Sequence, residues 1–492
     1  MGEVAIGKAM MGEVVIGIDS STQSTKVEAR NIETGQVVAS GQASHPATTP
    51  PVSEQDPNAW WHALVDAMAQ IPEEVRGEVA AVSVGGQQHG MVLLDDADQP
   101  VRPAKLWNDT TSAPQADRLV AALGAEAWAK RTGSMPVAAF TITKVAWVAE
   151  HEPELIDQTA KVMLPHDYLT YRLTGNHVTD RGDASGTGWY SAAGGEYDTA
   201  LLDTAGALIL RDRLARVLGP TEPAGELLTA VAEELGLRPG CKVGPGSGDN
   251  MAAALGLGLG AGDLVISLGT SGVAYARSAT PTNDPSGAVA GFADASGDFL
   301  PLVCTLNATK VTDAVAGWLG TDAPGLADLA ATAADDTGND ALVVVPWFDG
   351  ERTPNRPGAS GSMRGLRTDT TPAQIARAAH DGVLCGLLGG VDALGQCGVV
   401  TDGLLHLIGG GARSSAYRQR LADLWGRDIV VPDADETVAT GAAVQAAAIA
   451  GAEPLADIQQ RWSLGAGKSI WPTEAGLATA ADVRQRYRQA TA

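Results

Sequence analysis

The sequence has 492 residues, more than one hydrophobic core usually organises, so we expect more than one domain. It is 45% hydrophobic and 19% charged, a composition typical of globular proteins. The formal net charge of −24 argues against nucleic acid or an anionic membrane surface as a partner, because both require clustered Lys and Arg. No run of residues has the length and apolarity that a membrane helix needs.

The four cysteines form no Cys-x-x-Cys pair and have apolar or Gly-rich neighbours. We therefore expect reduced thiols packed in the core of a cytoplasmic protein. Residues 1–7 nearly repeat residues 11–17, and we interpret residues 1–12 as an extra N-terminal segment that arose from an alternative start or a cloning remnant. This segment has no sustained apolar region, so we expect no secretory signal.

A short apolar strand near the N-terminus leads into a turn of hydroxyl and amide side chains. We expect a strand at residues 14–18 that ends at Asp19, a turn over residues 20–25, and a returning strand at residues 26–29. Hydroxyls and backbone N–H groups in such a turn suit a phosphate, and a carboxylate at a strand end can hold Mg²⁺ through water. A polar hairpin with a solvated Asp explains the same pattern.

Two further stretches carry groups that suit a sugar. A strand expected at residues 79–84 runs into Gly-Gly-Gln-Gln-His-Gly, in which Gln88 and His89 can bond to hydroxyl groups. Residues 106–109 read Leu-Trp-Asn-Asp, and the ring of Trp107 suits stacking on the apolar face of a sugar. A structural histidine and a core tryptophan are the alternatives. Residues 111–240 have a mostly helical pattern, to which we assign no chemistry.

Residues 244–250 read Gly-Pro-Gly-Ser-Gly-Asp-Asn and precede a run of small apolar residues. The glycines and the proline oppose regular structure up to Asp249, and the run after it predicts a helix with Asp249 or Asn250 as its N-cap. A carboxylate at the end of a tight turn suits the base of a phosphoryl-transfer enzyme. An ordinary capping aspartate is the alternative.

Residues 264–276 repeat the pattern of the opening hairpin. An apolar strand leads into a Gly-Thr-Ser-Gly turn that contains Thr270 and Ser271, and a second strand returns. The similarity predicts an internal duplication at the scale of a domain. Two such turns would make a clamp for a polyphosphate.

The C-terminal third contains one further candidate and one false motif. A strand expected at residues 404–408 ends in three glycines, where Gly410 and Gly411 allow a flat ligand such as adenine to lie on the backbone, although a tight crossover explains them as well. Gly-Ala-Gly-Lys-Ser at residues 465–469 imitates the end of a P-loop. We reject it because Trp462 occupies the position of the required first glycine.

Eight motifs, in this order, resemble those of the FGGY family of carbohydrate kinases and together cover about residues 14–450. They lie at residues 19–25, 54–61, 86–90, 106–109, 248–250, 268–272, 350–354 and 409–414. The resemblance implies an α/β fold with two ribonuclease-H-like, actin-like ATPase domains and an interdomain cleft. It implies a sugar-binding domain over residues 13–257, an ATP-binding domain over residues 258–455 and a tail over residues 456–492.

The resemblance also implies an activity, the phosphorylation of D-xylulose to D-xylulose 5-phosphate with ATP and Mg²⁺. By this resemblance Asp249 is the catalytic base and Asp19 organises the metal. The residues implied for the sugar are Gln88, His89, Trp107 and Asn250. Those implied for ATP are Ser21, Thr22, Thr270 and Ser271 at the phosphates and Gly410 and Gly411 at the adenosine.

Two departures from the family pattern keep alternatives open. Asp-Ser-Ser-Thr stands at residues 19–22, where many members have Asp-x-Gly-Thr, and Gln88 stands where members that use xylulose often have Met. A kinase for ribulose, gluconate or glycerol is therefore an alternative. A chaperone-like ATPase of the same fold and a non-catalytic sugar sensor are further alternatives, which Asp249 beside sugar-type turns disfavours. The sequence leaves the oligomeric state open, a homodimer included, together with the role of residues 1–12.

Overall fold

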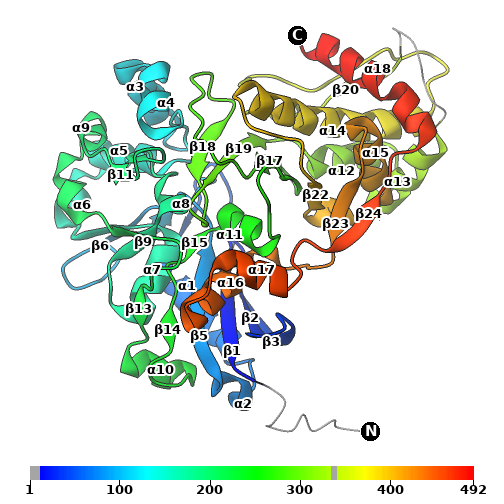
Figure 1. Cartoon of the computed structure of the whole chain (residues 1–492). Coiled ribbons are helices and arrows are strands. Elements are labelled where there is room, and N and C mark those ends of the chain that lie inside the picture. The colour runs from blue at the N-terminus through cyan, green and yellow to red at the C-terminus, as the bar shows by residue number, and fades with distance from the viewer. Residues whose placement is uncertain (1–11, 334–340) are drawn as a thin grey trace. The chain divides into compact units, whose positions relative to one another are not determined.

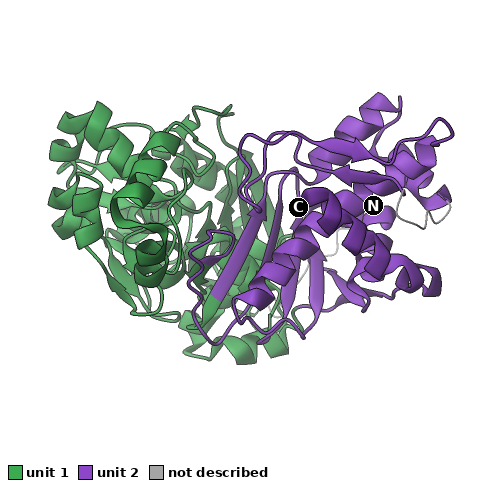
Figure 2. Ribbon diagram, turned by 90° about the horizontal axis from the view of Figure 1, so that it is seen from above, with its two compact units in different colours: residues 1–259, 291–299, 435–464 green, residues 260–290, 300–434, 465–492 purple. Residues whose placement is uncertain are grey.

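The computed structural model describes residues 12–333 and 341–492, which form two compact units (Figures 1 and 2). Unit 1 comprises the described residues up to 259 together with 291–299 and 435–464, and unit 2 comprises 260–290, 300–434 and 465–492. The predicted N-terminal segment lies outside the described residues, except for Gly12. Residues 435–464 were assigned by sequence to the ATP-binding domain up to residue 455, but they pack in unit 1.

The sheet of unit 1 begins with the predicted hairpin. Its strand order is β3-β2-β1-β5-β14-β13, and β15 also pairs with β5. Strands β1, β5, β14 and β15 run parallel, whereas β2 is antiparallel to β1 and to β3, and β13 is antiparallel to β14. The bounds are β1 (Val14–Ser20), β2 (Ser24–Asn31), β3 (Val37–Ser44), β5 (Val79–Gly86), β13 (Gly225–Glu226), β14 (Lys242–Val243) and β15 (Ser247–Gly248).

The part of the second large sheet that lies in unit 2 has the strand order β19-β17-β16-β22-β23-β24. Its pairs are antiparallel, antiparallel, parallel, parallel and antiparallel, the same succession as from β3 to β13 in unit 1. The predicted duplication is thus confirmed in strand order and direction. The bounds are β16 (Leu264–Leu268), β17 (Gly272–Ala276), β19 (Phe299–Thr305), β22 (Leu405–Ile408), β23 (Ile429–Pro432) and β24 (Gly467–Ile470). Because residues 467–470 form an edge strand, the P-loop-like sequence there is not a P-loop.

Helices and short strands surround the two sheets (Figure 1). The helices of unit 1 are α1 (Pro57–Met68), α2 (Glu73–Arg76), α3 (Ala113–Leu123), α4 (Ala125–Thr132), α5 (Thr141–His151), α6 (Pro153–Gln158), α7 (Pro165–Thr174), α8 (Arg181–Ala184), α9 (Ala200–Thr204), α10 (Thr229–Leu235), α11 (Asp249–Gly256), α16 (Thr437–Gly451) and α17 (Leu455–Arg461). Those of unit 2 are α12 (Thr309–Trp318), α13 (Ala323–Thr332), α14 (Pro372–Gln396), α15 (Ser415–Trp425) and α18 (Glu474–Thr491). The remaining strands are β4 (Glu54–Gln55), β6 (Val92–Leu94), β7 (Ala104–Lys105), β8 (Lys161–Met163), β9 (Val178–Asp180), β10 (Tyr190–Ser191), β11 (Glu196–Tyr197), β12 (Arg216–Leu218), β18 (Ala290–Ala293), β20 (Val343–Val345) and β21 (Ser362–Arg364).

Helices α1 and α11 differ in how their N-termini are capped. Asp56 caps α1, because its side chain accepts a hydrogen bond from the backbone N–H of Asn58 at 2.9 Å. The predicted cap of α11 is wrong: the N-cap is Gly248, not Asp249 or Asn250. Gly248 ends β15 with extended backbone, so Asp249 is already the first helical residue. Its carboxylate therefore stands at the very start of the helix.

Glycines bring α16 close to the strand and helix that carry the two candidate carboxylates. Helix α16 contacts β1, β5 and α11. A Cβ atom on Gly17 of β1 would lie 1.8 Å from the carbonyl oxygen of Ala439, and one on Gly441 would lie 1.8 Å from that of Ala252. Both positions therefore require glycine, since a methyl group there would overlap the facing backbone.

We expect Gly441→Ala to lower the stability of the fold by about 1–3 kcal/mol or more, because the added methyl group must push α16 away from α11. Thermal unfolding measures the effect. Gly451→Ala is the matched control, since it lies at the exposed end of the same helix and its nearest atoms are 3.9 Å from the added Cβ. That control should be neutral or slightly stabilising because Ala favours a helix over Gly. Equal melting temperatures for the two variants would contradict the packing argument.

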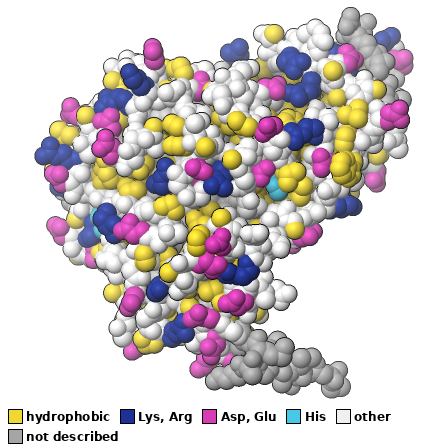
Figure 3. Space-filling model, in the orientation of Figure 1, with side chains coloured by type: hydrophobic (Ala, Val, Ile, Leu, Met, Phe, Trp, Pro, Cys, Tyr) yellow, Lys and Arg dark blue, Asp and Glu magenta, His cyan; other side chains and the backbone are white. Residues whose placement is uncertain are grey.

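Among residues 12–333 and 341–492, no helix combines the length and apolarity required to cross a membrane. Figure 3 shows that Lys and Arg side chains are interspersed with Asp and Glu side chains over the visible face. On this face the acidic excess of the sequence is therefore spread out and does not form one patch.

Candidate active site

The sheet of unit 1 brings Asp19 and Asp249 to the same edge. Gly85 of β5 lies opposite Asp19 of β1 on one side and opposite Ser247 of β15 on the other. Because the three strands run parallel and neighbouring strands are about 4.8 Å apart, their carboxyl ends open together within about 10 Å. Asp249 follows β15 directly, so both carboxylates belong to one site.

Asn250 holds the carboxylate of Asp249. Oδ1 of Asp249 accepts hydrogen bonds from the backbone N–H of Asn250 at 2.7 Å and from its side-chain Nδ2 at 2.9 Å. Asp249 keeps some contact with solvent. Burial raises its pKa to about 6, although the bonds from Asn250 oppose the shift. A carboxylate with this pKa is ionised at neutral pH and accepts a proton more readily than an ordinary aspartate.

The carboxylate of Asp19 is buried and incompletely paired. Its Oδ1 has no hydrogen-bond partner in the described parts of the chain. Burial, and after it the charge of Asp249, raise the pKa of Asp19 to about 7 against the opposing charge of Lys26. Lys26 itself is paired with Glu436 at 2.7 Å. A carboxylate that is buried and lacks hydrogen bonds needs a nearby cation to stabilise its ionised form.

The donor set around Asp19 fits Mg²⁺. The residues described contain no group of three or more His, Cys, Asp or Glu side chains that could enclose a metal. Mg²⁺ is usually bound by one or two carboxylates, with water and substrate phosphates completing the shell, so Asp19 with its unpaired oxygen suffices. Asp19 therefore stays our candidate for the metal.

Three side-chain atoms that lack a hydrogen-bond partner among the described residues lie on the segments that the sequence predicts for the sugar. Oε1 of Gln88 accepts a hydrogen bond from Nδ2 of Asn250 at 2.8 Å, which joins the turn after β5 to the start of α11. Nε2 of Gln87, Nε2 of Gln88 and Oδ1 of Asn108 are buried and have no partner within the described structure. Unpaired buried groups are rare and costly, so their presence on these segments favours a polar ligand that supplies the missing hydrogen bonds.

Trp107 and His89 differ in their surroundings. Trp107 is 41% exposed, and its Nε1 donates a hydrogen bond to Oγ1 of Thr22 at 2.9 Å, so part of the ring is accessible for stacking. His89 is buried in left-handed backbone (φ 64°), with its ring 5.0 Å from that of Phe140 and 5.5 Å from that of Phe292. The sugar-binding role of His89 stays a prediction.

A charged cluster that was not predicted from the sequence supports the turn of His89. Oδ1 of Asp183 accepts a hydrogen bond from the backbone N–H of His89 at 3.4 Å. Nε2 of the fully buried His166 lies 3.3, 3.2 and 3.5 Å from carboxylate oxygens of Asp167, Asp180 and Asp183. Burial lowers the pKa of His166, but these three carboxylates outweigh it and raise the pKa to about 9. The dense Asp pattern at residues 180–183 was a signal, but its distant partner was not visible in the sequence.

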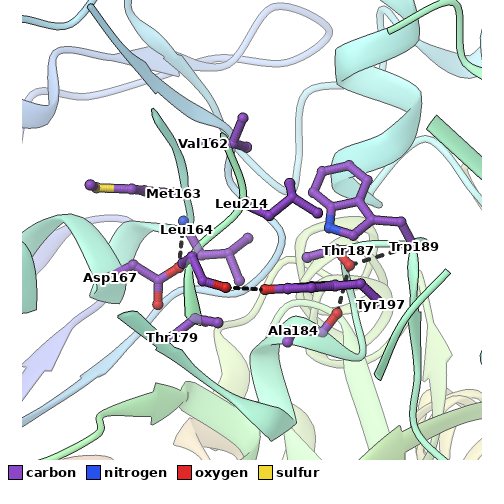
Figure 4. Close-up of a pocket in the computed structure, with 11 residues that line it drawn as sticks. Val162, Met163, Leu164, Asp167, Thr179, Ala184, Thr187, Trp189, Tyr197 and Leu214 are labelled. Atoms are coloured by element: carbon purple, nitrogen blue, oxygen red, sulfur yellow. Dashed lines mark hydrogen bonds between the residues drawn. The ribbon is translucent and has the colours of Figure 1, made fainter. Parts of the chain in front are cut away.

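Asp167 also borders a small cavity in unit 1 (Figure 4). The space open to the centre of a water molecule is about 10 Å³, enough for one water and too small for a sugar. Leu164 donates a backbone hydrogen bond to Asp167 at 2.9 Å, and Tyr197 donates one to the carbonyl oxygen of Ala215 at 2.8 Å. None of the predicted site residues lines this cavity.

In the first hydroxyl turn the side chains already have partners within unit 1. Oγ of Ser21 donates to the carbonyl oxygen of Ser24 at 3.0 Å. Oγ1 of Thr22 donates to Oε1 of Gln87 at 3.2 Å and accepts from Trp107. A phosphate at this turn would therefore meet backbone N–H groups before it meets a free hydroxyl. The roles predicted for Ser21 and Thr22 stay predictions.

The second hydroxyl turn lies between β16 and β17 in unit 2. Thr270 is exposed and Ser271 is half-buried. The turn is fixed by backbone hydrogen bonds from Gly269 to Ser271 at 3.0 Å and from Ala308 to Thr270 at 3.1 Å. Glu351, from the motif at residues 350–354, supports the same region because its Oε1 accepts from the backbone N–H of Leu306 at 2.6 Å. The hydroxyls of the turn are thus held at the surface of unit 2.

The three glycines after β22 have separate roles. Gly409 has φ 85°, and a Cβ on Gly411 would lie 2.7 Å from Cβ of Leu268, so both are required by the packing. A Cβ on Gly410 would meet nothing within 4 Å. Gly410 therefore presents bare backbone to open space, as an adenine ring requires. Since Leu268 immediately precedes the turn of Thr270, the glycines and the hydroxyls are neighbours.

Comparison with known protein families shows to which family the chain belongs. The N-terminal domain of the FGGY family of carbohydrate kinases matches residues 14–256, and the C-terminal domain of that family matches residues 264–450. The chain belongs to the FGGY family of carbohydrate kinases. The family resemblance carried by the eight motifs and the two-domain α/β fold are both confirmed.

Relatives of this FGGY kinase include one from Streptomyces coelicolor named "Xylulose kinase", which is 49% identical over 96% of this chain and 95% of its own. The crystal structure of xylulose kinase from Bifidobacterium adolescentis shares 40% identity with a TM-score of 0.84, over 98% of this chain and 100% of that one. The structure of gluconate kinase from Lactobacillus acidophilus has a TM-score of 0.89 at 24% identity, over 97% of each chain. That last match concerns the fold alone, so the FGGY fold does not by itself select the sugar.

Proposed function

We propose that this FGGY kinase transfers the terminal phosphoryl group of ATP to D-xylulose and releases D-xylulose 5-phosphate. The observation that carries the proposal is the chain of hydrogen bonds from Asp249 through Asn250 to Gln88, which sets a carboxylate of pKa about 6 among sugar-type polar groups. The 49% identity to the Streptomyces coelicolor relative supports xylulose as the sugar.

In the proposed reaction Asp249 acts as the base. A sugar hydroxyl gives its proton to the Asp249 carboxylate while its oxygen forms a bond to the terminal phosphorus of ATP. The bond from that phosphorus to the bridging oxygen breaks, and ADP leaves. Asn250 fixes the carboxylate, and the exposed part of the Trp107 ring orients the sugar, so positioning supplies much of the acceleration.

Each unit contains residues that we assign to a part of the nucleotide. Asp19 would hold Mg²⁺, which neutralises charge on the phosphate oxygens when it is bound. Thr270 and Ser271 would bond to phosphate oxygens with their hydroxyls, and the turn of Ser21 and Thr22 would do so with its backbone. The exposed backbone of Gly410 would lie against the adenosine, with Gly411 beside it. The free thiols of all four cysteines support a cytoplasmic location.

A panel of sugars in an ADP-release assay tests the proposal. D-xylulose should give the highest kcat/KM, about tenfold or more above ribulose, gluconate and glycerol, because polar groups aligned for one sugar are left unpaired by another. NMR of the product should place the phosphate on the hydroxyl group of C5, as in D-xylulose 5-phosphate. A preference for gluconate or another polyol would overturn the choice of xylulose.

Two other outcomes of the same assay would overturn the kinase assignment itself. Steady ADP release that no sugar stimulates indicates an ATPase of the chaperone type. Thermal stabilisation by a sugar without any ADP release in the presence of Mg²⁺ and ATP indicates a sensor.

A further inference from the structure

The hydroxyl group of Thr22 joins the first hydroxyl turn to the sugar-site residues of unit 1. It accepts a hydrogen bond from Nε1 of Trp107 at 2.9 Å and donates one to Oε1 of Gln87 at 3.2 Å. Trp107 and Gln87 come from segments far from Thr22 in the sequence, after β7 and β5 respectively. One small side chain thus sets the orientation of two others.

The chemistry of these groups determines which atom donates and which accepts in each of the two hydrogen bonds. An indole N–H is only a donor, so the oxygen of Thr22 must accept there. A hydroxyl has a single proton, and that proton is used on Gln87. The hydroxyl of Thr22 therefore has no proton left for a phosphate oxygen while both bonds persist.

The backbone of Thr22 is fixed separately. Nε2 of Gln55 donates to the carbonyl oxygen of Thr22 at 3.0 Å, and Oε1 of Gln55 accepts from Nε1 of the buried Trp60 at 2.8 Å. Gln55 and Trp60 both lie in the motif at residues 54–61. Removing the hydroxyl of Thr22 should therefore leave the path of the backbone unchanged, because the turn does not depend on it.

We infer that Thr22 is a positioning residue for the sugar: its hydroxyl holds the indole of Trp107 at the angle at which the exposed part of the ring stacks on the substrate. The inference rests on the proposed function, and it reassigns the Thr22 side chain from the phosphates of ATP to the sugar. Only the backbone of Thr22 is left for the nucleotide.

Thr22→Val tests the inference because valine keeps the shape of threonine and removes both hydrogen bonds. KM for D-xylulose should rise about 5- to 20-fold, the effect expected from losing the bond that orients Trp107, while KM for ATP and kcat stay within about threefold. Trp107→Phe, which keeps an aromatic face but loses the N–H, should behave in the same way. The double variant should be no worse than the more affected single variant, since each single variant already removes the bond between Trp107 and Thr22.

Two controls complete the kinetic test. Thr22→Ser retains the hydroxyl and should restore KM for D-xylulose to within about twofold of the wild-type value. Thr204→Val makes the same chemical change at an exposed position of α9 and should change neither KM. A raised KM for ATP with an unchanged KM for the sugar, or additive effects in the double variant, would overturn the inference.

A spectroscopic readout separates this inference from the proposed function. In protein labelled with ¹⁵N-tryptophan, the Trp107 indole N–H signal is identified by its loss in Trp107→Phe. It should shift and exchange faster with water in Thr22→Val than in Thr22→Ser. An unshifted signal overturns the inference whatever the activity. A shifted signal in a protein that phosphorylates no sugar would support the bond and refute the proposed function.

Discussion

Asp249→Asn should lower kcat with D-xylulose by about 10²-fold or more and leave sugar binding nearly unchanged. An amide cannot take the proton of a sugar hydroxyl at neutral pH, whereas its Oδ1 can still accept the hydrogen bonds that Asn250 donates. ADP release measures turnover, and the shift of the melting temperature on adding D-xylulose measures binding without ATP. Loss of turnover with retained stabilisation assigns the residue to the chemical step.

The pH dependence of kcat/KM in the wild-type enzyme should also reflect the protonation of Asp249. The pKa of Asp249 is raised to about 6 by burial, so its carboxylate becomes protonated, and useless as a base, below that pH. In saturating Mg²⁺ and ATP, where the bound metal would keep Asp19 ionised, kcat/KM for D-xylulose should therefore decline about tenfold per pH unit on the acid side of about 6. Asp249→Asn should lack this decline in its residual activity.

Asp66→Asn is a matched control for Asp249→Asn. Asp66 is exposed on α1 in the same unit, and the change of side chain is identical. Its kcat should equal that of the wild type. Turnover of Asp249→Asn near the wild-type value would refute the role of the base. A lower melting temperature for Asp249→Asn than for Asp66→Asn at pH 8 would attribute the loss to folding instead.

The parts of the fold that depend on local pattern could be predicted from the sequence. The strand, hydroxyl turn and returning strand at residues 14–29 and again at residues 264–276 are read from runs of apolar residues interrupted by short polar turns. The same strand order in the two sheets follows from that repeat. Asp19 and Asp249 could be chosen because each stands where an apolar strand or a Gly-rich turn ends.

The contacts that complete the site could not be predicted, because they join segments that are distant in the sequence. Lys26 pairs with Glu436 across 410 positions, and the hydroxyl of Thr22 meets Trp107 across 85. From the sequence, Thr22 is expected to bind phosphates because a turn rich in hydroxyls suits them in general. Only the tertiary structure shows which atom accepts the proton of its hydroxyl group. The cap of α11 was misplaced for a related reason: Asp is a common N-cap, but here pairing with β5 extends β15 up to Gly248.

Asp19→Asn should inactivate the kinase and stabilise the fold at the same time. Loss of the carboxylate removes the proposed metal ligand, so kcat should fall about 10²-fold or more, and added Mg²⁺ should not restore it. The stabilisation follows from the surroundings of Asp19: it is buried, its Oδ1 is unpaired among the residues described, and it lies near the carboxylate of Asp249. A neutral amide removes that unfavourable charge. The melting temperature at pH 8 should rise by roughly 2–6 °C.

The dependence of this stabilisation on pH distinguishes charge burial from a simple packing effect. The pKa of Asp19 is raised from 3.8 to about 7, so the folded protein binds this proton more tightly than the unfolded chain does. The loss of folding stability caused by the ionised Asp19 carboxylate is therefore complete above about pH 7. It becomes smaller as the pH falls and is absent below about 3.8. The advantage of Asp19→Asn over the wild type should be larger at pH 8 than at pH 5. Mg²⁺ with ADP should stabilise the wild type more than the variant. An advantage that is equal at the two pH values, or a variant less stable than the wild type at pH 8, would show that the carboxylate is already compensated within the protein and that Asp19 has no need of a metal.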